Sequence, residues 1–270
     1  MLINTGARAV DPKKDQPPVA ISQMPAIQVP KEKPSAAPVI LDSPISLHVF
    51  PNVIQGSDEW HDQRRGLATA SVVGLLITTK TLKAAANETS RGLAAKLAAE
   101  RITGYTEPSA TSRDMERGTL DEPYARELYA ETYAPVEQVG FMVRDDFGFK
   151  IGYSPDGLVG EDGLIEIKSR AQKKHLQTVL EDAVPAENMA QIQCGLLVSG
   201  RKWCDYVSYC GGMALWTKRV FPDPAWQSAI VAAISAFEAL ATDMISTYLA
   251  KTDGAPIAER IDHFGDEEIQ

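Results

Sequence analysis

Two acids and a lysine lie close together in a segment of the chain that has the pattern of a β-hairpin. Asp156 lies in a turn between proline and glycine, and Glu166 and Lys168 follow on the strand-like segment 164–168. Because side chains alternate between the two faces of a strand, Glu166 and Lys168 share one face, and the intervening isoleucines face a core. A second turn at 160–163 folds the segment back, which brings Asp156 towards Glu166.

Carboxylates held this close repel one another unless a divalent cation lies between them. Oxygen ligands with a few waters suit Mg²⁺ or Mn²⁺. The hairpin therefore indicates the site of a metal-dependent nuclease. One alternative stays open on this segment alone, because a turn aspartate and a Glu-Lys pair also occur on ordinary solvated sheet faces.

The composition is typical of a soluble chain with one domain of catalytic size. Of 270 residues, 44% are hydrophobic and 23% are charged, which allows a sizeable core. No apolar run approaches the roughly 20 residues that span a bilayer, and the amino terminus lacks the pattern of a signal peptide. We therefore expect a cytoplasmic protein with no membrane contact. Three scattered cysteines and four histidines argue against a disulfide framework and structural zinc.

The formal charge of -9 argues against nucleic acid as a partner, because phosphate contacts come from basic surfaces. The distribution of charge matters more than the total. Basic residues occur together at several places where DNA would need them: Arg64-Arg65, Lys168, Arg170, Lys173-Lys174 and Arg201-Lys202. A bound metal would also offset the acids of the site.

The chain divides into three parts by composition. Residues 1–48 hold eight of the 17 prolines and no helical or strand period, which predicts a disordered, polyproline-like extension. Residues 49–250 form the expected catalytic domain. Residues 251–270 form an acidic tail.

The body reads as helices followed by strands and then helices again. Helices are expected over 57–65, after Ser71, over 91–102 and over 117–133, where Pro123 predicts a start near Asp121 or a kink. The expected strands cover 136–144, 149–153, 164–168, 203–209 and 214–220, and further helices cover 171–181, 186–198 and 223–249. This order predicts an α/β (α+β) fold with a central mixed β-sheet flanked by helices.

Six motifs occur in order along this body. They are Trp60-His61-Asp62-Gln63-Arg64-Arg65-Gly66, Thr69-Ala70-Ser71, Arg117-Gly118-Thr119-Leu120-Asp121-Glu122, Ser154-Pro155-Asp156-Gly157, Glu166-Ile167-Lys168 and Met189-Ala190-Gln191-Ile192-Gln193. In this order they resemble the motifs of the lambda-type (YqaJ-like) phage recombination exonucleases of the PD-(D/E)XK nuclease superfamily. The match covers about residues 50–220 and implies a restriction-endonuclease-like core.

The resemblance implies roles for particular residues. Asp156 and Glu166, with the backbone carbonyl of Ile167, match the ligands of one divalent ion, and Glu122 matches an acid that faces a second ion. Lys168 matches the lysine beside the attacking water, where it stabilises the charge on the phosphate. Each site would therefore hold two Mg²⁺ ions, or Mn²⁺ in their place.

The resemblance also implies a substrate and partners. Arg64, Ser71 and Gln191 match a pocket for the 5′-terminal phosphate of the strand being digested. The implied activity is 5′→3′ degradation of one strand of linear double-stranded DNA to mononucleotides, which leaves a 3′ overhang for recombination. The implied assembly is a homotrimer ring around DNA, with a single-strand annealing protein as partner, in the cytoplasm of a bacterium or of a phage-infected host.

Two alternatives and one departure remain. The same fold could carry an endonuclease or a nuclease of other polarity, or a non-catalytic DNA-binding module. After Lys168 the family continues with a small residue and proline, whereas this chain continues with Ser169-Arg170. The path of DNA beyond Lys168 is therefore not given by the resemblance. Asp146 lies where the family can carry another acid, but we interpret it as a turn residue.

Overall fold

The computed structural model describes residues 45–108 and 112–261. The body of the molecule extends to Leu249 and forms one compact unit, and the segment from Ala250 belongs to a second unit. Residues 1–44 of the expected extension (1–48) and residues 262–270 of the acidic tail (251–270) lie outside the described residues. Both therefore stay predictions.

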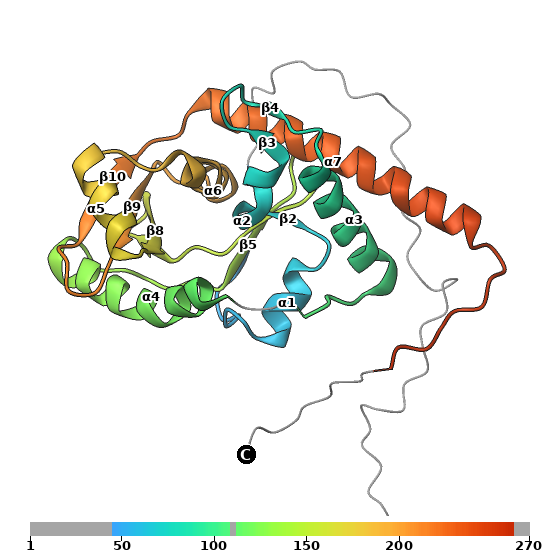
Figure 1. The fold of residues 1–270 in the computed structure, drawn as a ribbon, viewed down its shortest axis with the longest axis horizontal. Helices are drawn as coiled ribbons and strands as arrows, with labels where there is room; N and C mark the ends of the chain where they lie inside the picture. Colours follow the sequence, from blue (N-terminus) through green and yellow to red (C-terminus); the bar gives the residue numbers. More distant parts are fainter. Residues whose placement is uncertain (1–44, 109–111, 262–270) are drawn as a thin grey trace, which may run out of the picture. The chain divides into compact units, whose positions relative to one another are not determined.

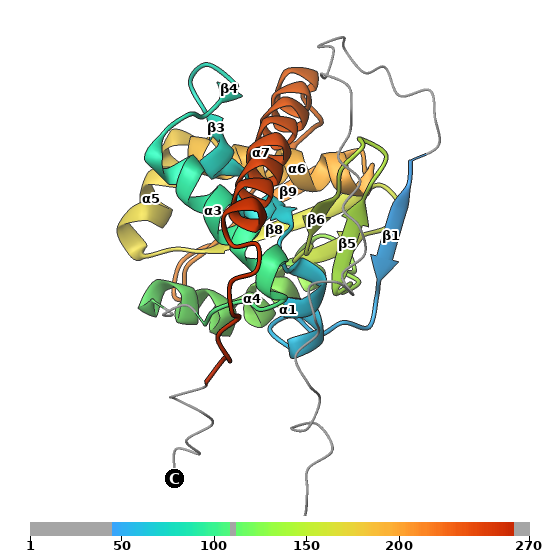
Figure 2. The ribbon, with the colours of Figure 1, turned by 90° about the vertical axis from the view of Figure 1, so that its right-hand side faces the viewer.

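The first sheet of the body has four strands in the order β1-β5-β6-β2. Its strands are β1 (Leu47–Phe50), β2 (Ala68–Thr69), β5 (Phe141–Arg144) and β6 (Ile151–Tyr153). The pairs β1-β5 and β5-β6 are antiparallel, whereas β2 runs parallel to β6. Figure 2 shows β1 at the outer edge of this sheet, beside β5.

The second sheet carries the predicted hairpin and has the order β10-β9-β8-β7. Its strands are β7 (Gly157–Val159), β8 (Gly163–Ser169), β9 (Trp203–Tyr209) and β10 (Trp216–Val220). Only the β8 and β9 pair is parallel. A separate two-stranded hairpin joins β3 (Ile77–Thr78) to β4 (Lys83–Ala84).

The expected α/β class is confirmed, but the strands form several sheets rather than one central sheet. The strand expected over 136–144 is wrong in its first half, where only a single bridge joins Glu137 to Leu158. This bridge links the region before β5 to β7, and the continuous pairing begins at Phe141. The polypeptide therefore passes from one sheet to the other next to the predicted site.

Helices cover both faces of the second sheet (Figure 1). The helices of the body are α1 (Asp58–Arg64), α2 (Ala70–Val73), α3 (Glu88–Thr103), α4 (Arg113–Thr132), α5 (Gln172–Glu181), α6 (Ala186–Ser199) and α7 (Pro224–Lys251), with a 3-10 turn η2 (Gly74–Leu76) after α2. The larger core cluster includes Leu164 of β8 with residues of α6 and α7. A smaller cluster joins Ile165 and Ile167 of β8 to Ala125 and Tyr129 of α4. The alternation predicted for the hairpin is therefore confirmed: the two isoleucines face α4.

The helix that carries Glu122 begins earlier than expected. It starts at Arg113, where the hydroxyl of Ser112 accepts a hydrogen bond from the amide of Met115 (3.2 Å), and it continues through Pro123. Of the two predicted alternatives, a start near Asp121 or a kink, the start is wrong, because this serine cap begins the helix two turns upstream. A proline removes one helical hydrogen bond and disfavours a helix, but the burial of Ala125 and Tyr129 holds the segment in place.

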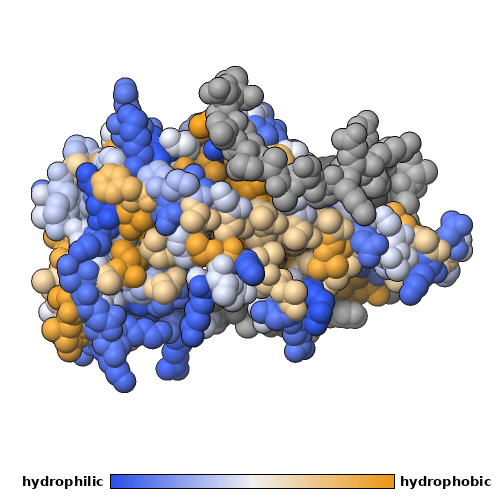
Figure 3. All heavy atoms as spheres, turned by 90° about the horizontal axis from the view of Figure 1, so that it is seen from above, coloured by the Kyte–Doolittle hydropathy of each residue, from blue (hydrophilic) through white to orange (hydrophobic). Residues whose placement is uncertain are grey.

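The last helix corrects the expectation that no apolar segment is long enough to span a membrane. By length and composition α7 meets that test, with 28 residues and a mean hydropathy of 1.5 in its most apolar window. Its large side chains Ile230, Ile234 and Phe237 are buried in the main core, as in the core helix of a folded domain. Figure 3 views the molecule from the side on which α7 lies, where weakly and strongly apolar residues mix with hydrophilic ones.

The turn after α1 is fixed by α3. The amide of Gly66 donates to the buried carboxylate of Glu100 (2.7 Å), and the carbonyl of Gly66 accepts from Arg101 (2.8 Å). Arg101 also forms two hydrogen bonds with Glu238 of α7 (2.6 and 2.7 Å). Gly66 has a φ of +68°, which a residue with a side chain adopts only at a cost. These contacts fix the end of α1, where Arg64 lies.

Gly140 allows a close approach of two backbone segments before α1. A Cβ atom built on Gly140 would lie 1.9 Å from the carbonyl oxygen of Val53. We expect Gly140→Ala to lower the free energy of unfolding by about 1–3 kcal/mol, as overpacking does. Chemical denaturation measures this change. The control is Gly92→Ala in α3, where the added methyl meets no atom within 4 Å and should stabilise by about 0.5–1 kcal/mol. Equal stability of the two variants would contradict the close approach.

Candidate active site

The β7-β8 hairpin brings Asp156 and Glu166 together. Gly157 pairs with Ile165 in the antiparallel register, so the preceding residue, Asp156, lies next to Glu166 across the hairpin. One oxygen of Asp156 accepts a hydrogen bond from the backbone amide of Ile167 (2.6 Å). This bond fixes the aspartate beside the strand that carries the other acid.

Glu166 is fully buried, and Lys168 is its cationic neighbour. The ammonium of Lys168 lies 2.6 Å from Oε1 of Glu166 and donates to the amide oxygen of Gln191 (3.0 Å). Oε1 of Glu166 is therefore paired with an ammonium, whereas Oε2 has no hydrogen-bond donor among the described residues.

Burial shifts the protonation of the acids. Burial, followed by the charge of Asp156, raises the pKa of Glu166 to about 7, and the same two causes raise the pKa of Glu122 to about 7. Burial also raises the pKa of Asp156. Burial lowers the pKa of Lys168, but Glu166 and Asp156 outweigh this effect, so its pKa is raised and it stays charged. The mutual influence of these groups shows that they share one electrostatic site.

Arg126 is a site residue that the sequence analysis missed. Its guanidinium pairs with the carboxylate of Glu122 one turn earlier on α4, and its Nε donates to the backbone carbonyl of Asp156 (2.7 Å). Arg126 therefore links the helix that carries Glu122 to the hairpin. The available signal was the spacing of four residues between the two charges, which is that of a helical ion pair.

The residues present fit a divalent cation. Glu166 offers a buried oxygen that has no hydrogen-bond donor among the described residues, Asp156 lies beside it, and carboxylate oxygens are the ligands that Mg²⁺ and Mn²⁺ prefer. Within residues 45–108 and 112–261 no three acidic, histidine or cysteine side chains form a ready-made metal group. Glu122 does not join Asp156 and Glu166 in such a group, because it is paired with Arg126.

Arg64 lies in a cluster of hydroxyl groups. Its guanidinium donates to Ser71 (3.1 Å), Thr69 (3.3 Å) and Ser154 (3.3 Å). The indole of Trp60 donates to the same Ser154 hydroxyl (2.8 Å) and lies with its ring 4.0 Å from the guanidinium carbon. Burial lowers the pKa of Arg64 to about 10, so it stays charged at neutral pH. Trp60, Thr69 and Ser154 were not expected in this cluster.

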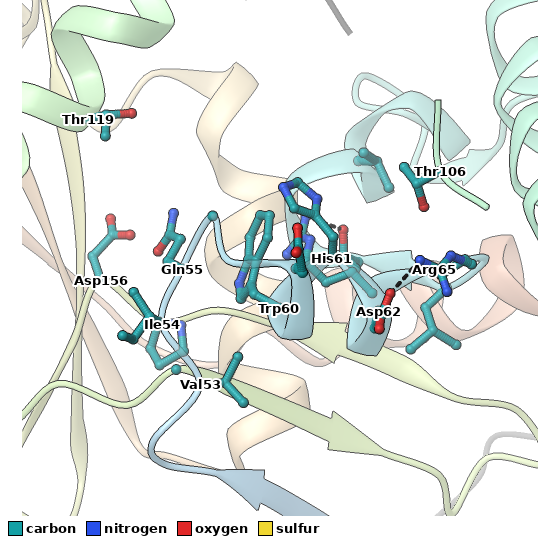
Figure 4. A pocket seen from close by; sticks show the side chains of 18 of the residues that line it. Val53, Ile54, Gln55, Trp60, His61, Asp62, Arg65, Thr106, Thr119 and Asp156 are labelled. Atoms are coloured by element: carbon teal, nitrogen blue, oxygen red, sulfur yellow. Dashed lines mark hydrogen bonds and ion pairs between the residues drawn. The ribbon is translucent and has the colours of Figure 1, made fainter. Parts of the chain in front are cut away.

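A cleft of about 1460 Å³ joins the two groups of residues, since Arg64, Trp60, Glu122, Arg126 and Asp156 all line it. Figure 4 shows Asp156 and Thr119 towards one end of this pocket, and Trp60 and His61 of α1 at its middle. A group bound at Arg64 would therefore face the acids across one continuous space.

Gln191 and Asp146 contact residues outside the Arg64 cluster. Gln191 contacts Lys168 rather than Arg64 or Ser71 within the described residues, so it borders the acids. Asp146 forms two hydrogen bonds with Arg144 (2.6 and 2.8 Å), and Arg144 also donates to the carbonyl of Leu197. These contacts give Asp146 a structural partner, in agreement with its interpretation as a turn residue.

The mixed α/β fold, with its buried acids and lysine on a hairpin, defines a nuclease of the PD-(D/E)XK class. Residues 59–202 match the family of YqaJ-like viral recombinase domains. The chain belongs to this family. No curated protein matches it.

Solved structures agree with this assignment. An alkaline exonuclease from Laribacter hongkongensis is 32% identical, with a TM-score of 0.66 over 74% of this chain and 100% of that chain. Its complex with dAMP gives 33% identity and a TM-score of 0.64 over the same shares. A phage related exonuclease from Haemophilus somnus is 14% identical over 67% of this chain and 96% of that chain, with a TM-score of 0.54, which shows likeness of fold alone.

The raised pKa values predict how the stability of the metal-free protein depends on pH. Glu122 and Glu166 have pKa values of about 7 in the fold against an ordinary value of 4.5. Their stabilising protonation is complete below the ordinary pKa and is lost as the pH rises through about 7. We expect the melting temperature in EDTA to fall from about pH 5 to about pH 8, and added Mg²⁺ to raise it more at the higher pH.

Glu166→Gln provides the control for this titration. The amide cannot ionise, so the fall in melting temperature should be smaller in this variant, and the effect of Mg²⁺ should be weaker. The same pH dependence in the wild type and in Glu166→Gln would contradict the assignment of the titration to this site.

Proposed function

We propose that this nuclease is a Mg²⁺-dependent 5′→3′ exonuclease. It degrades one strand of linear double-stranded DNA from a 5′-phosphorylated end, releases mononucleotides, and leaves a 3′ single-stranded overhang for recombination by strand annealing. Mn²⁺ would serve in place of Mg²⁺, with two ions at each site. The observation that carries the proposal is the half-buried Arg64, with its cluster of hydroxyl groups, in the same cleft as the acids.

The Arg64 cluster suits a terminal phosphate. A guanidinium offers planar pairs of donors to phosphate oxygens, and the hydroxyls of Ser71, Thr69 and Ser154 offer further donors at its rim. Burial of Arg64 strengthens its attraction for a doubly charged group. An internal phosphodiester carries less charge, so the cluster favours a strand end.

Ser154 belongs to the Arg64 cluster and lies close in sequence to the acid Asp156. It contacts Arg64 directly, and it precedes Asp156 by only two residues, a span of at most about 7 Å. A distance of this order accommodates a single nucleotide between the bound terminal phosphate and the next phosphate. This spacing supports release of one nucleotide at each cut.

The proposed reaction is hydrolysis of the first phosphodiester of the strand. Water attacks phosphorus, the bond to the 3′ oxygen of the first nucleotide breaks, and that oxygen takes up a proton. The products are a nucleoside 5′-monophosphate and a strand with a new 5′-phosphate, which can enter the Arg64 cluster in turn. Divalent ions at the acids would activate the water and stabilise the charge of the transition state.

The protein groups divide this work between them. Asp156, Glu166 and the carbonyl of Ile167 would hold one ion, and Glu122, which pairs with Arg126 in the structure, would be the ligand of a second ion. Lys168 keeps its positive charge because of Glu166, so it can stabilise the negative charge that develops on the phosphate. Gln191 accepts a hydrogen bond from Lys168 and holds its ammonium in position.

The proposed assembly is a homotrimer ring that encircles DNA, with a single-strand annealing protein as partner in the cytoplasm of a bacterium or a phage-infected host. The support for these points is the family membership. A closed ring also explains how a chain with a charge of -9 could hold DNA, because only the channel needs positive charge.

Cleavage of end-labelled duplexes tests the reaction. We expect Mg²⁺-dependent release of mononucleotides from a linear duplex with 5′-phosphates, slower release from 5′-hydroxyl ends, and no cutting of closed circles. Lys168→Ala should lower the rate by about 10²–10³-fold, as the loss of a transition-state donor does. Cutting of circles would instead support an endonuclease, and equal rates on both ends would exclude the terminal-phosphate pocket.

Arg64→Lys separates the pocket from the cutting centre. Lysine keeps the charge but loses the paired donors of the guanidinium. We expect the preference for 5′-phosphate over 5′-hydroxyl ends to fall by about tenfold, equivalent to roughly 1.4 kcal/mol, with cleavage of 5′-hydroxyl ends largely retained. Arg65→Lys is the matched control, because Arg65 pairs with Asp62 and has no contact with Ser71 or Ser154 among the described residues. A variant of Arg64 that slows both substrates equally would argue against a role in end recognition.

A further inference from the structure

A second, smaller cavity of about 240 Å³ lies beside Lys168. Its lining includes four basic residues, Arg117, Lys168, Arg170 and Lys174, and two acidic residues, Asp114 and Glu187. Arg117 pairs with Asp114, Lys168 with Glu166 and Arg170 with Glu187. Lys174 therefore supplies the excess positive charge of the lining, which would attract an anion.

Arg170 gives this cavity a fixed wall. Its side chain is only 10% exposed, and its Nε donates to the hydroxyl of Tyr206 (2.8 Å). Its guanidinium also donates to the amide oxygen of Asn188 and lies 3.4 Å from Glu187. A buried arginine held on several sides loses little freedom when it attracts an anion, so its charge is preorganised.

Lys174 and the start of α5 give the cavity its open side. Lys174 lies in the first turn of α5 and is exposed, and its ammonium forms no ion pair with the described residues. Helix α5 begins at Gln172 with no side-chain cap and no acid in its first turn. Its unpaired backbone amides and the helix dipole add positive potential at the same place.

The position of the cavity relative to the acids indicates which part of the DNA strand it would contact. Arg64, Glu122 and Asp156 line the large cleft, whereas Lys168 lines the small cavity. If the 5′-terminal phosphate lies at Arg64 and the scissile phosphate at the acids, a strand that continues past Lys168 would bring its next phosphates to Arg170 and Lys174.

We propose that this cavity binds a backbone phosphate of the digested strand, one or two linkages to the 3′ side of the scissile bond. The inference rests on the proposed 5′→3′ exonuclease function and extends it to the strand beyond the cut. It assigns a purpose to Arg170 and Lys174, which follow the point where this chain departs from its family's motif. Holding this phosphate would keep the scissile linkage from sliding between cuts.

Single-turnover cleavage of duplexes with neutral linkages tests the proposal. The variant is Lys174→Gln, and the matched control is Lys173→Gln, because Lys173 is its exposed neighbour on α5 but does not line the cavity. A methylphosphonate replaces one charged phosphate at a time along the 5′-phosphorylated strand. We expect Lys174→Gln to slow cleavage several-fold and Lys173→Gln to leave it near the wild-type rate.

Combining Lys174→Gln with each methylphosphonate substrate identifies the phosphate that Lys174 contacts. A methylphosphonate one or two linkages beyond the scissile bond should slow the wild type, and on that substrate Lys174→Gln should have no further effect. Equal rates for the two lysine variants, or coupling only to linkages on the 5′ side, would overturn the cavity proposal while the exonuclease function stands. A wild-type protein that cleaves no 5′-phosphorylated duplex would overturn the proposed function itself.

Discussion

The constraint on which the site depends is the burial of acids next to one another. Glu166 is buried, Asp156 lies beside it at the wall of the cleft, and Glu122 adds a third acid nearby. Buried like charges are costly unless they are protonated or neutralised. Lys168 and Arg126 supply positive charge from the hairpin and from α4, and the raised pKa values show that neutralisation is incomplete. The helices around the hairpin therefore have to hold cations against it, and a divalent ion completes the balance.

The sequence predicted the hairpin well because its signals are local. Turn residues, the alternation around Glu166 and the spacing to Asp156 all lie within one short segment, and the structure places the two acids together as expected. The start of α4 was missed because its cap, Ser112, lies upstream of the family motif.

The contacts of Arg126 with Asp156 and of Trp60 with Ser154 join segments 30 and 94 residues apart, and no local pattern encodes such pairs. Gln191 was assigned to the phosphate pocket by resemblance, whereas its contact in the structure is with Lys168.

The position of Arg64 depends on contacts that are remote from any catalytic motif. The turn at Gly66 is held by Glu100 and Arg101 of α3, and Arg101 is held in turn by Glu238 of α7. The long apolar helix α7 thus contributes to the geometry of the cleft through one ion pair. This explains why a helix whose apolar composition would suit a membrane is part of the site's support.

The pairing of Arg126 with Glu122 has a consequence for the history of this family. The two charges lie one turn apart on α4, and Arg126 also supports the carbonyl of Asp156. Loss of Glu122 would leave a buried cation without its counter-charge, and loss of Arg126 would leave an acid beside two others. Substitution of either residue alone would therefore cost stability. We expect the two residues to occur together in relatives, and relatives that lack one to have replaced the other.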